Sequence, residues 1–145
     1  MDFTLDAEQV ALRDAVRSLF RGAYPSSEER RAATKHDHGW SEKTWAQLAE
    51  MGALGLPFAE ADGGMGAGPV EVSIVAEEIG RVIAPEPYVE AVVLAGGLVA
   101  AAGTDEQRAE ILGALSEGTL VPAFAHNEPG QRYSEAAAGV SASKN

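Results

Sequence analysis

The stretch SEKTWAQLAEMGALGLPFAEADGGMGAGP, residues 41–69, decides the fold of this 145-residue chain. Its first third predicts a helix that begins at Ser41, because apolar residues recur there at helical spacing. The predicted buried stripe consists of Trp45, Leu48, Ala49 and Met51. Gly52 is placed for a left-handed helix stop. Residues 54–57 (LGLP) then predict an extended link into a glycine-dense turn, so this stretch indicates a helical domain.

Upstream of this stretch, residues 6–22 predict another helix. Asp6 followed by Gln9 is the pattern of a capping box, and apolar residues then recur with the period of a helix. Pro25 closes this element. Residues 26–39 predict one charged helix and a loop.

Downstream, three further helices are predicted. Residues 69–83 are apolar around much of the helical circumference, which predicts a central helix. Residues 88–102 follow two prolines and predict a second buried helix. Thr104 with Gln107 gives another capping box, and the last helix runs from there to Gly118.

The character of the sequence changes at Thr119. Residues 119–125 (TLVPAFA) are short, apolar and bounded by turn formers, which predicts a strand. From Glu128 onward the chain is small and polar, and a lone strand has no sheet to join. The sequence therefore predicts a mainly α fold, with a helical domain over residues 1–118 and the start of a β-domain over residues 119–145.

Composition and charge argue against several classes of protein. Lys plus Arg is 11 and Asp plus Glu is 22, and the resulting charge of −11 repels nucleic acid and anionic membranes. The absence of cysteine excludes disulfides and thiolate chemistry, and it fits a reducing cytoplasm. The acidic N-terminus does not resemble a signal peptide. The longest weakly polar stretch, residues 89–103, is too short to span a bilayer.

Three features raise the question of a functional site, and each has a simpler interpretation. The glycine-rich residues 62–69 lack the Gly-Lys-Ser/Thr ending of a P-loop and follow no strand, which favours an interhelical turn. His36 and His38 have no third ligand at a suitable spacing, so no metal site is expected. His126 is a candidate acid or base, or an ordinary histidine at the rim of a sheet.

Five motifs occur along the chain in an order that is typical of one enzyme family. They are Trp45-x-x-Leu48-x-x-Met51-Gly52-x-Leu54-Gly55-Leu56, Gly63-Gly64-Met65-Gly66, Glu77-Glu78-Ile79-Gly80-Arg81, Gly103-Thr104-x-x-Gln107 and Ala123-Phe124-Ala125-x-x-Glu128-Pro129-Gly130. In this order they resemble the acyl-CoA dehydrogenase family over nearly all of residues 1–134. The resemblance implies an N-terminal helical domain that runs into a middle β-barrel, followed by a C-terminal helical bundle.

The resemblance also implies a chemistry. In the family, a carboxylate takes the α-proton of an acyl-CoA thioester and the β-hydrogen leaves as hydride to FAD, which gives a trans-2-enoyl-CoA. Hydrogen bonds to the thioester carbonyl raise the acidity of the α-proton. Electron-transferring flavoprotein usually accepts the electrons, and the enzymes usually form homo- or heterotetramers. The catalytic base of the family lies outside this chain, so the resemblance implies no catalytic residue here and no activity for the chain alone.

The resemblance assigns flavin contacts to the end of the predicted strand. The residues concerned are Phe124, His126, Asn127 and Gly130. Where the family commonly has Ala-Gly-Ser-Asp, this chain has Gln-Arg-Tyr-Ser, so the larger Tyr133 stands among residues that contact the flavin or the acyl-CoA. The Glu-Pro-Gly-x-Arg-Tyr form is similar to divergent actinobacterial members. These include two-gene, heteromeric enzymes that act on steroid side-chain CoA thioesters.

The acyl pocket of the family lies partly on the third and fourth helices. Val89, Val93 and Gly97 share a helical face and are the residues expected to contact substrate. Gly96 and Gly97 each cost roughly 1 kcal/mol relative to Ala in a helix, which indicates that room is needed, either for close helix packing or for an acyl chain. Two other functions stay open: a non-enzymatic helical interaction module, and a relative with different flavin chemistry, such as a monooxygenase or a nitroalkane oxidase.

Overall fold

The computed structural model of the chain describes residues 4–35, 37–128, 139–141 and 143. Its α-helices are α1 (Ala7–Ala23), α2 (Ser27–Ala33), α3 (Glu42–Glu50), α4 (Pro69–Val82), α5 (Gly97–Ala102) and α6 (Asp105–Ser116). The same residues contain the 3-10 helices η1 (Ala53–Gly55) and η2 (Glu60–Asp62), the π-helix η3 (Val89–Gly96), and no strand. The prediction of a mainly α fold is confirmed.

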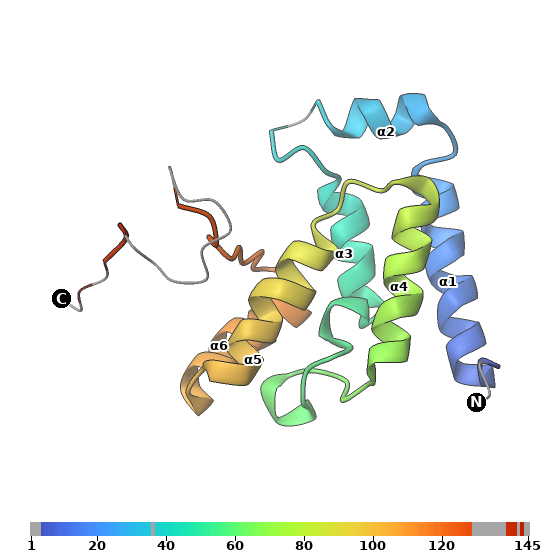
Figure 1. Ribbon diagram of the computed structural model, residues 1–145. Coiled ribbons are helices and arrows are strands. Elements are labelled where there is room, and N and C mark those ends of the chain that lie inside the picture. Colours follow the sequence, from blue (N-terminus) through green and yellow to red (C-terminus); the bar gives the residue numbers. More distant parts are fainter. Residues whose placement is uncertain (1–3, 36, 129–138, 142, 144–145) are drawn as a thin grey trace.

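The helices pack around a common core. α1 and α4 lie side by side, α3 packs against α1, and α5 and α6 form a further pair (Figure 1). α2 crosses one end of this bundle and contributes no buried side chain. The large core side chains include Phe20, Tyr24, Trp45, Leu48, Leu54, Phe58, Tyr88, Leu112 and Leu115. Segments from α1 to α6 therefore share one hydrophobic core.

The helix ends follow the signals in the sequence. The Asp6 carboxylate accepts a hydrogen bond from the Gln9 N–H at 2.8 Å, and the Gln9 side-chain oxygen accepts from the Asp6 N–H at 3.1 Å. Thr104 and Gln107 make the same reciprocal pair at the start of α6. Gly52 has a φ of 72°, the left-handed conformation that glycine adopts without strain. Both capping boxes and the glycine stop are confirmed.

The link after α3 differs from its prediction. Residues 54–57 were expected to be extended, but the chain here forms η1 and a following turn. The N–H of Met65 donates to the Gly55 carbonyl at 2.9 Å, and the N–H of Ala67 donates to the Leu56 carbonyl at 2.8 Å. The link is compact because its apolar side chains fill the core while the glycine-rich loop satisfies its carbonyls.

Two of the predicted helices also differ from expectation. α4 buries Ile74, Val75 and Glu78 but leaves Val70 exposed, so it is covered on one face and is not central. An apolar circumference does not reveal which side a neighbour will cover. The predicted helix over residues 88–102 divides into the π-helix η3 and the short α5.

The predicted strand is absent. Residues 119–128 form neither helix nor strand. A strand needs a hydrogen-bonded neighbour, and the residues that the structure describes offer none. The start of a β-domain at residue 119, and the division of the chain there, therefore stay predictions.

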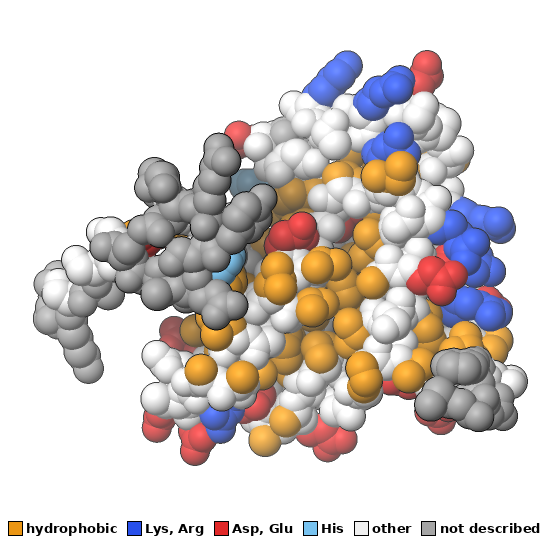
Figure 2. Space-filling model, viewed as in Figure 1, with side chains coloured by type: hydrophobic (Ala, Val, Ile, Leu, Met, Phe, Trp, Pro, Cys, Tyr) orange, Lys and Arg blue, Asp and Glu red, His pale blue; other side chains and the backbone are white. Residues whose placement is uncertain are grey.

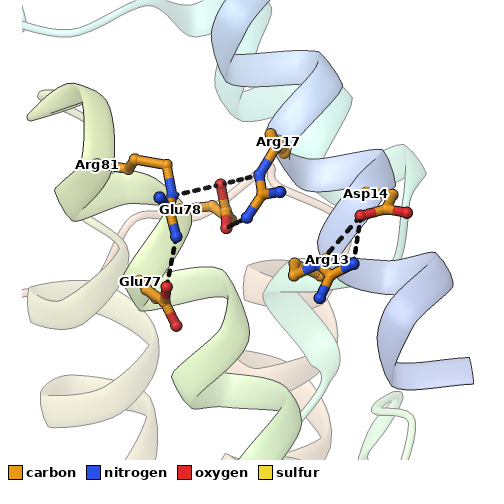
Figure 3. Close-up of polar contacts among 6 residues, drawn as sticks. All are labelled: Arg13, Asp14, Arg17, Glu77, Glu78 and Arg81. Atoms are coloured by element: carbon orange, nitrogen blue, oxygen red, sulfur yellow. Dashed lines mark hydrogen bonds and ion pairs between the residues drawn. The ribbon is translucent and has the colours of Figure 1, made fainter. Parts of the chain in front are cut away.

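An ion-pair network joins α4 to α1 through the buried carboxylate of Glu78, whose partners Arg17 and Arg81 are 29 % and 48 % exposed. Arg17 donates two hydrogen bonds to the carboxylate of Glu78, at 2.9 and 2.7 Å (Figure 3). Arg81 approaches the same carboxylate at 3.2 Å and pairs with Glu77 at 2.6 Å. The hydrogen bonds from Arg17 hold the pKa of the Glu78 carboxyl below its usual value, although burial opposes the shift. Because this pair joins the neighbouring helices α1 and α4, we interpret Glu78 as a structural residue.

Candidate functional site

The segment that was predicted to contact flavin is open to solvent. Phe124 is 48 % exposed and its ring lies 5.5 Å from the ring of His126. The His126 N–H donates to the Phe124 carbonyl at 3.0 Å, and Asn127 is exposed beside them. The structure thus brings three of the four predicted flavin residues together on one exposed turn. Gly130 and the predicted substrate residue Tyr133 lie outside the described residues.

The predicted acyl residues lie on η3 and α5. Val89 and Val93 are both exposed, whereas Gly97 is half-buried. A Cβ atom added at Gly97 would have no heavy atom within 4 Å, apart from its immediate helical surroundings. The structure therefore leaves space at Gly97 and places the two valines on the surface.

A larger apolar face surrounds these residues. Figure 2 shows hydrophobic side chains gathered across the middle of the molecule, over α4 and α5. The exposed large hydrophobic side chains of η3 and α5 are Val89 (42 %), Val93 (40 %), Leu94 (51 %) and Leu98 (47 %). The exposed Glu90 directly follows Val89 in η3. A face of this kind marks a surface that meets a ligand or another protein surface. Leu94 and Leu98 were missed in the sequence because helical spacing of the α type does not put them on the face of Val89.

The glycine-rich loop is a turn and offers little to a phosphate group. The N–H groups of residues 63–67 all donate to backbone carbonyls of residues 55–60, and the Gly68 N–H donates to the Glu71 carboxylate at 2.9 Å. Phosphate-binding loops present free N–H groups to the anion. A Cβ at Gly64 would lie 2.2 Å from the Phe58 carbonyl oxygen, so this glycine is required by close packing. The interpretation of these residues as a tight turn is supported.

A buried carboxyl joins three elements at the end of the bundle that α2 crosses. Glu86 is 4 % exposed, and its Oε1 accepts hydrogen bonds from the Tyr24 hydroxyl and, at 3.4 Å, from the Ser41 N–H. Its Oε2 is buried without a hydrogen-bond partner in the structure. Burial raises the pKa of the Glu86 carboxyl, and burial also raises the pKa of Tyr24. The flanking prolines in the sequence indicate a rigid linker, but they do not reveal this burial.

The other candidates are weaker. A hollow of about 1230 Å³ lies among α1, α2 and α3, with Leu19, Trp40 and Met51 among its lining residues, and none of the predicted flavin or acyl residues lines it. Of the two histidines considered as metal ligands, His38 has its Nε2 3.4 Å from Oε1 of Glu42. Within the described part of the chain, no three His, Asp or Glu side chains gather as metal ligands do. None of the helices there has the length and apolarity that crossing a bilayer requires.

The helical part of the chain matches a known protein domain. The family model for the N-terminal domain of acyl-CoA dehydrogenases matches residues 6–119. The chain belongs to the acyl-CoA dehydrogenase family. The match begins just before α1 and ends just after α6, at residue 119, so it includes every helix of the described residues.

One curated relative and two solved structures are also similar to this chain. Acyl-CoA dehydrogenase FadE12 of Mycobacterium tuberculosis is 35 % identical over 88 % of this chain and 32 % of its own length. The ChsE4–ChsE5 complex of Mycobacterium tuberculosis has a TM-score of 0.79 and 28 % identity, covering 91 % of this chain and 36 % of that one. A chain in a structure of the electron-transferring flavoprotein of Acidaminococcus fermentans has a TM-score of 0.76 and 31 % identity. The similarity covers 90 % of this chain and 34 % of that one. The chain spans about a third of the length of the curated relatives it matches.

Proposed function

We propose that this chain is the N-terminal part of an FAD-dependent acyl-CoA dehydrogenase that introduces an α,β double bond into an acyl-CoA thioester. The observation that carries the proposal is the match of residues 6–119 to the N-terminal domain of that family. The exposed apolar face over α4 and α5 agrees with it, because a domain that works against further structure keeps such a face uncovered.

The residues of the exposed turn fit a flavin in part. Phe124 and His126 present adjacent rings that suit an aromatic ligand, and Asn127 carries an amide that can donate to a carbonyl of the flavin pyrimidine. The His126 N–H is occupied by the Phe124 carbonyl, so it would have to be released to contact the ligand. FAD, when bound, supplies the hydride acceptor. In this proposal Phe124, His126, Asn127, Gly130 and Tyr133 hold its edge or the neighbouring substrate.

The acyl group lies, in this proposal, against η3 and α5. Val89 and Val93 present aliphatic surface, and Gly97 leaves room beside them. These residues bind the acyl group and exclude water from it, but they carry no group that could take a proton. In this proposal the base that removes the α-proton therefore comes from outside this chain. The Glu-Pro-Gly-x-Arg-Tyr form resembles members that include enzymes of steroid side-chain CoA thioesters, so a steroid side chain is one candidate for the acyl group.

The partners follow from the same proposal. The ChsE4–ChsE5 structure is a complex of two named proteins, which supports a heteromeric assembly for this chain as well as a homomeric one. The similarity to a chain in the flavoprotein structure from Acidaminococcus fermentans agrees with electron-transferring flavoprotein as the electron acceptor.

Two measurements test the proposed function. The first is the intact mass of the protein made by its native gene, which we expect to lie far above the 15.1 kDa of this chain. The second is flavin content and acyl-CoA-dependent bleaching of the flavin absorbance in that native product. Bleaching by an acyl-CoA, with none for this chain alone, is the expected result. A native product of 15.1 kDa that contains no flavin would refute the proposal and favour the alternative of a non-enzymatic helical interaction module.

A further inference from the structure

The hollow among α1, α2 and α3 lies apart from the proposed dehydrogenase site. Its volume of about 1230 Å³ is large enough to hold a whole small molecule. Side chains from α1, from the segment over residues 37–44 and from α3 line it, and α2 crosses the same end of the bundle (Figure 1). None of the described residues assigned above to flavin or to the acyl group lines it. The fold therefore builds a concave surface that the proposed function does not use.

Part of the lining is apolar and aromatic. Leu19, Trp40 and Met51 line the hollow, are half-buried and pack against the core. The ring centroid of Trp40 lies 5.7 Å from that of His38 and 5.6 Å from that of the buried Trp45. These contacts hold the Trp40 ring in place. Such a surface removes the apolar part of a ligand from water, and the face of an indole ring also attracts a cation.

Three residues with hydroxyl groups, Tyr24, Ser41 and Thr44, also line the hollow. The Tyr24 hydroxyl donates its proton to the carboxyl of Glu86, so its oxygen is left to accept hydrogen bonds. Burial and the bond to Glu86 raise the pKa of Tyr24, so the phenol stays neutral. An ammonium group has three N–H donors and no acceptor, which matches a set of three hydroxyl oxygens.

A buried carboxyl lies behind these hydroxyls. Glu86 is 4 % exposed, and its Oε1 accepts from Tyr24 and, at 3.4 Å, from the Ser41 N–H, which both belong to lining residues. Its Oε2 has no hydrogen-bond partner among the residues that the structure describes. Burial raises the pKa of Glu86, whereas a cation bound beside Tyr24 would favour the ionised carboxylate. A bound cation would therefore offset the cost of burying this group.

The charged residues around the hollow are mainly acidic. Glu29, Asp37 and Glu42 line it as exposed carboxylates, and the basic residues of the lining are Lys43 and His38. The balance of charge is negative even before Glu86 is included. The resulting field favours the entry of a cation and disfavours an anion.

We propose that this hollow binds a small organic cation, a primary ammonium group carried on an apolar stem. The ammonium group donates to the hydroxyls of Tyr24, Ser41 and Thr44, and the stem lies against Trp40. Glu86 is a positioning residue, because it acts through the Tyr24 hydroxyl. The inference does not rest on the proposed function, so either can fail without the other.

Tryptophan fluorescence of the 145-residue chain tests the ligand, because its two tryptophans, Trp40 and Trp45, are the two indole rings in contact at the hollow. Phenethylamine is the cationic probe, phenethyl alcohol its uncharged isostere, and hydrocinnamate an anion with the same ring. Phenethylamine should give a saturable change with a dissociation constant on the order of 1 mM, since so small a ligand gains little free energy. The alcohol should bind more weakly and hydrocinnamate should not bind. A response to phenethylamine that does not saturate, or equal binding of hydrocinnamate, would overturn the proposal.

Matched variants locate the cation. Glu42→Gln and Glu50→Gln each neutralise an exposed carboxylate of α3, but only Glu42 lines the hollow. Glu42→Gln should weaken phenethylamine binding about two- to fivefold, as expected for an exposed charge, and Glu50→Gln should leave it unchanged. Equal affinities of these two variants would place the cation outside the hollow.

Glu86→Gln separates the buried charge from the fold, because glutamine keeps the shape of the side chain and an oxygen that can accept from Tyr24. It should weaken phenethylamine binding about tenfold without lowering the urea midpoint. A merely structural role would leave the affinity unchanged as long as the variant is folded. Equal affinity of the parent protein and Glu86→Gln would therefore refute the role of the carboxyl.

Discussion

Alanine substitutions at Gly96 and Gly97, which are neighbours at the junction of η3 and α5, should change the free energy of unfolding in opposite directions. At Gly96 a Cβ would lie 2.5 Å from Phe58 and 3.0 Å from Leu115, so the core must shift by close to an ångström. Overpacking of this kind costs about 1–3 kcal/mol, and the helix propensity of alanine offsets about 1 kcal/mol of it. At Gly97 a Cβ meets nothing within 4 Å, so Gly97→Ala should stabilise the fold by about 0.5–1 kcal/mol.

The two variants should therefore differ by about 2 kcal/mol in the free energy of unfolding. For a chain of this size that is a difference of about 6 °C in Tm, with Gly96→Ala below the parent protein and Gly97→Ala above it. Thermal and urea unfolding followed by far-UV circular dichroism measures both quantities. Gly22→Ala, another helical glycine with an open Cβ position, is the matched control and should behave as Gly97→Ala does. Equal shifts at positions 96 and 97 would refute the packing that anchors η3.

Three further predictions concern the ends and the buried charges of the bundle. Ile83 has a φ of 53° and is 68 % exposed, so Ile83→Gly should raise the unfolding free energy by about 1 kcal/mol; an unchanged urea midpoint would contradict the strained backbone. Burial raises the pKa of Glu86, so the stability that its protonated carboxyl contributes is present at low pH and is lost as pH rises through that pKa. Glu86→Gln should therefore gain stability over the parent protein as pH rises above the ordinary carboxyl value of about 4. A gain that does not grow with pH would show that the carboxyl is not buried as described. Arg17→Met should lower the free energy of unfolding, because the buried carboxylate of Glu78 then keeps only Arg81 as an ion-pair partner. Adding Glu78→Leu should recover much of that lost free energy, as measured by urea unfolding. No recovery would mean that Arg17 acts through packing alone.

Local signals in the sequence were sufficient for the ends of several helices. Asp6 with Gln9 and Thr104 with Gln107 form reciprocal hydrogen bonds across three residues, and Gly52 adopts its left-handed conformation beside α3. Each feature depends on atoms that are neighbours along the chain, so no knowledge of the fold is needed to place it. The order of such features was also sufficient to indicate the family, which the match over residues 6–119 confirms.

The candidate site depended on contacts between residues far apart in the sequence. The prediction of an extended link was wrong because the apolar side chains of η1 pack into the core. The strand over residues 119–125 stays a prediction, because the described residues offer no second strand for it to pair with. The sequence grouped Val89 and Val93 with Gly97 by α-helical periodicity, and it could not separate the packing role of Gly96 from the open space at Gly97. That distinction depends on Phe58 and other core side chains from elsewhere in the chain.

The sequence by itself determined that this is a helical chain of the acyl-CoA dehydrogenase type with capped helices and a glycine-rich turn. Only the tertiary structure decided that residues 89–96 form a π-helix, that Leu94 and Leu98 join the exposed apolar face, and that the carboxyl of Glu86 is buried. The physical reason is the range of the interactions. Caps and turns are local, whereas burial and helical register depend on how distant side chains fill the same space.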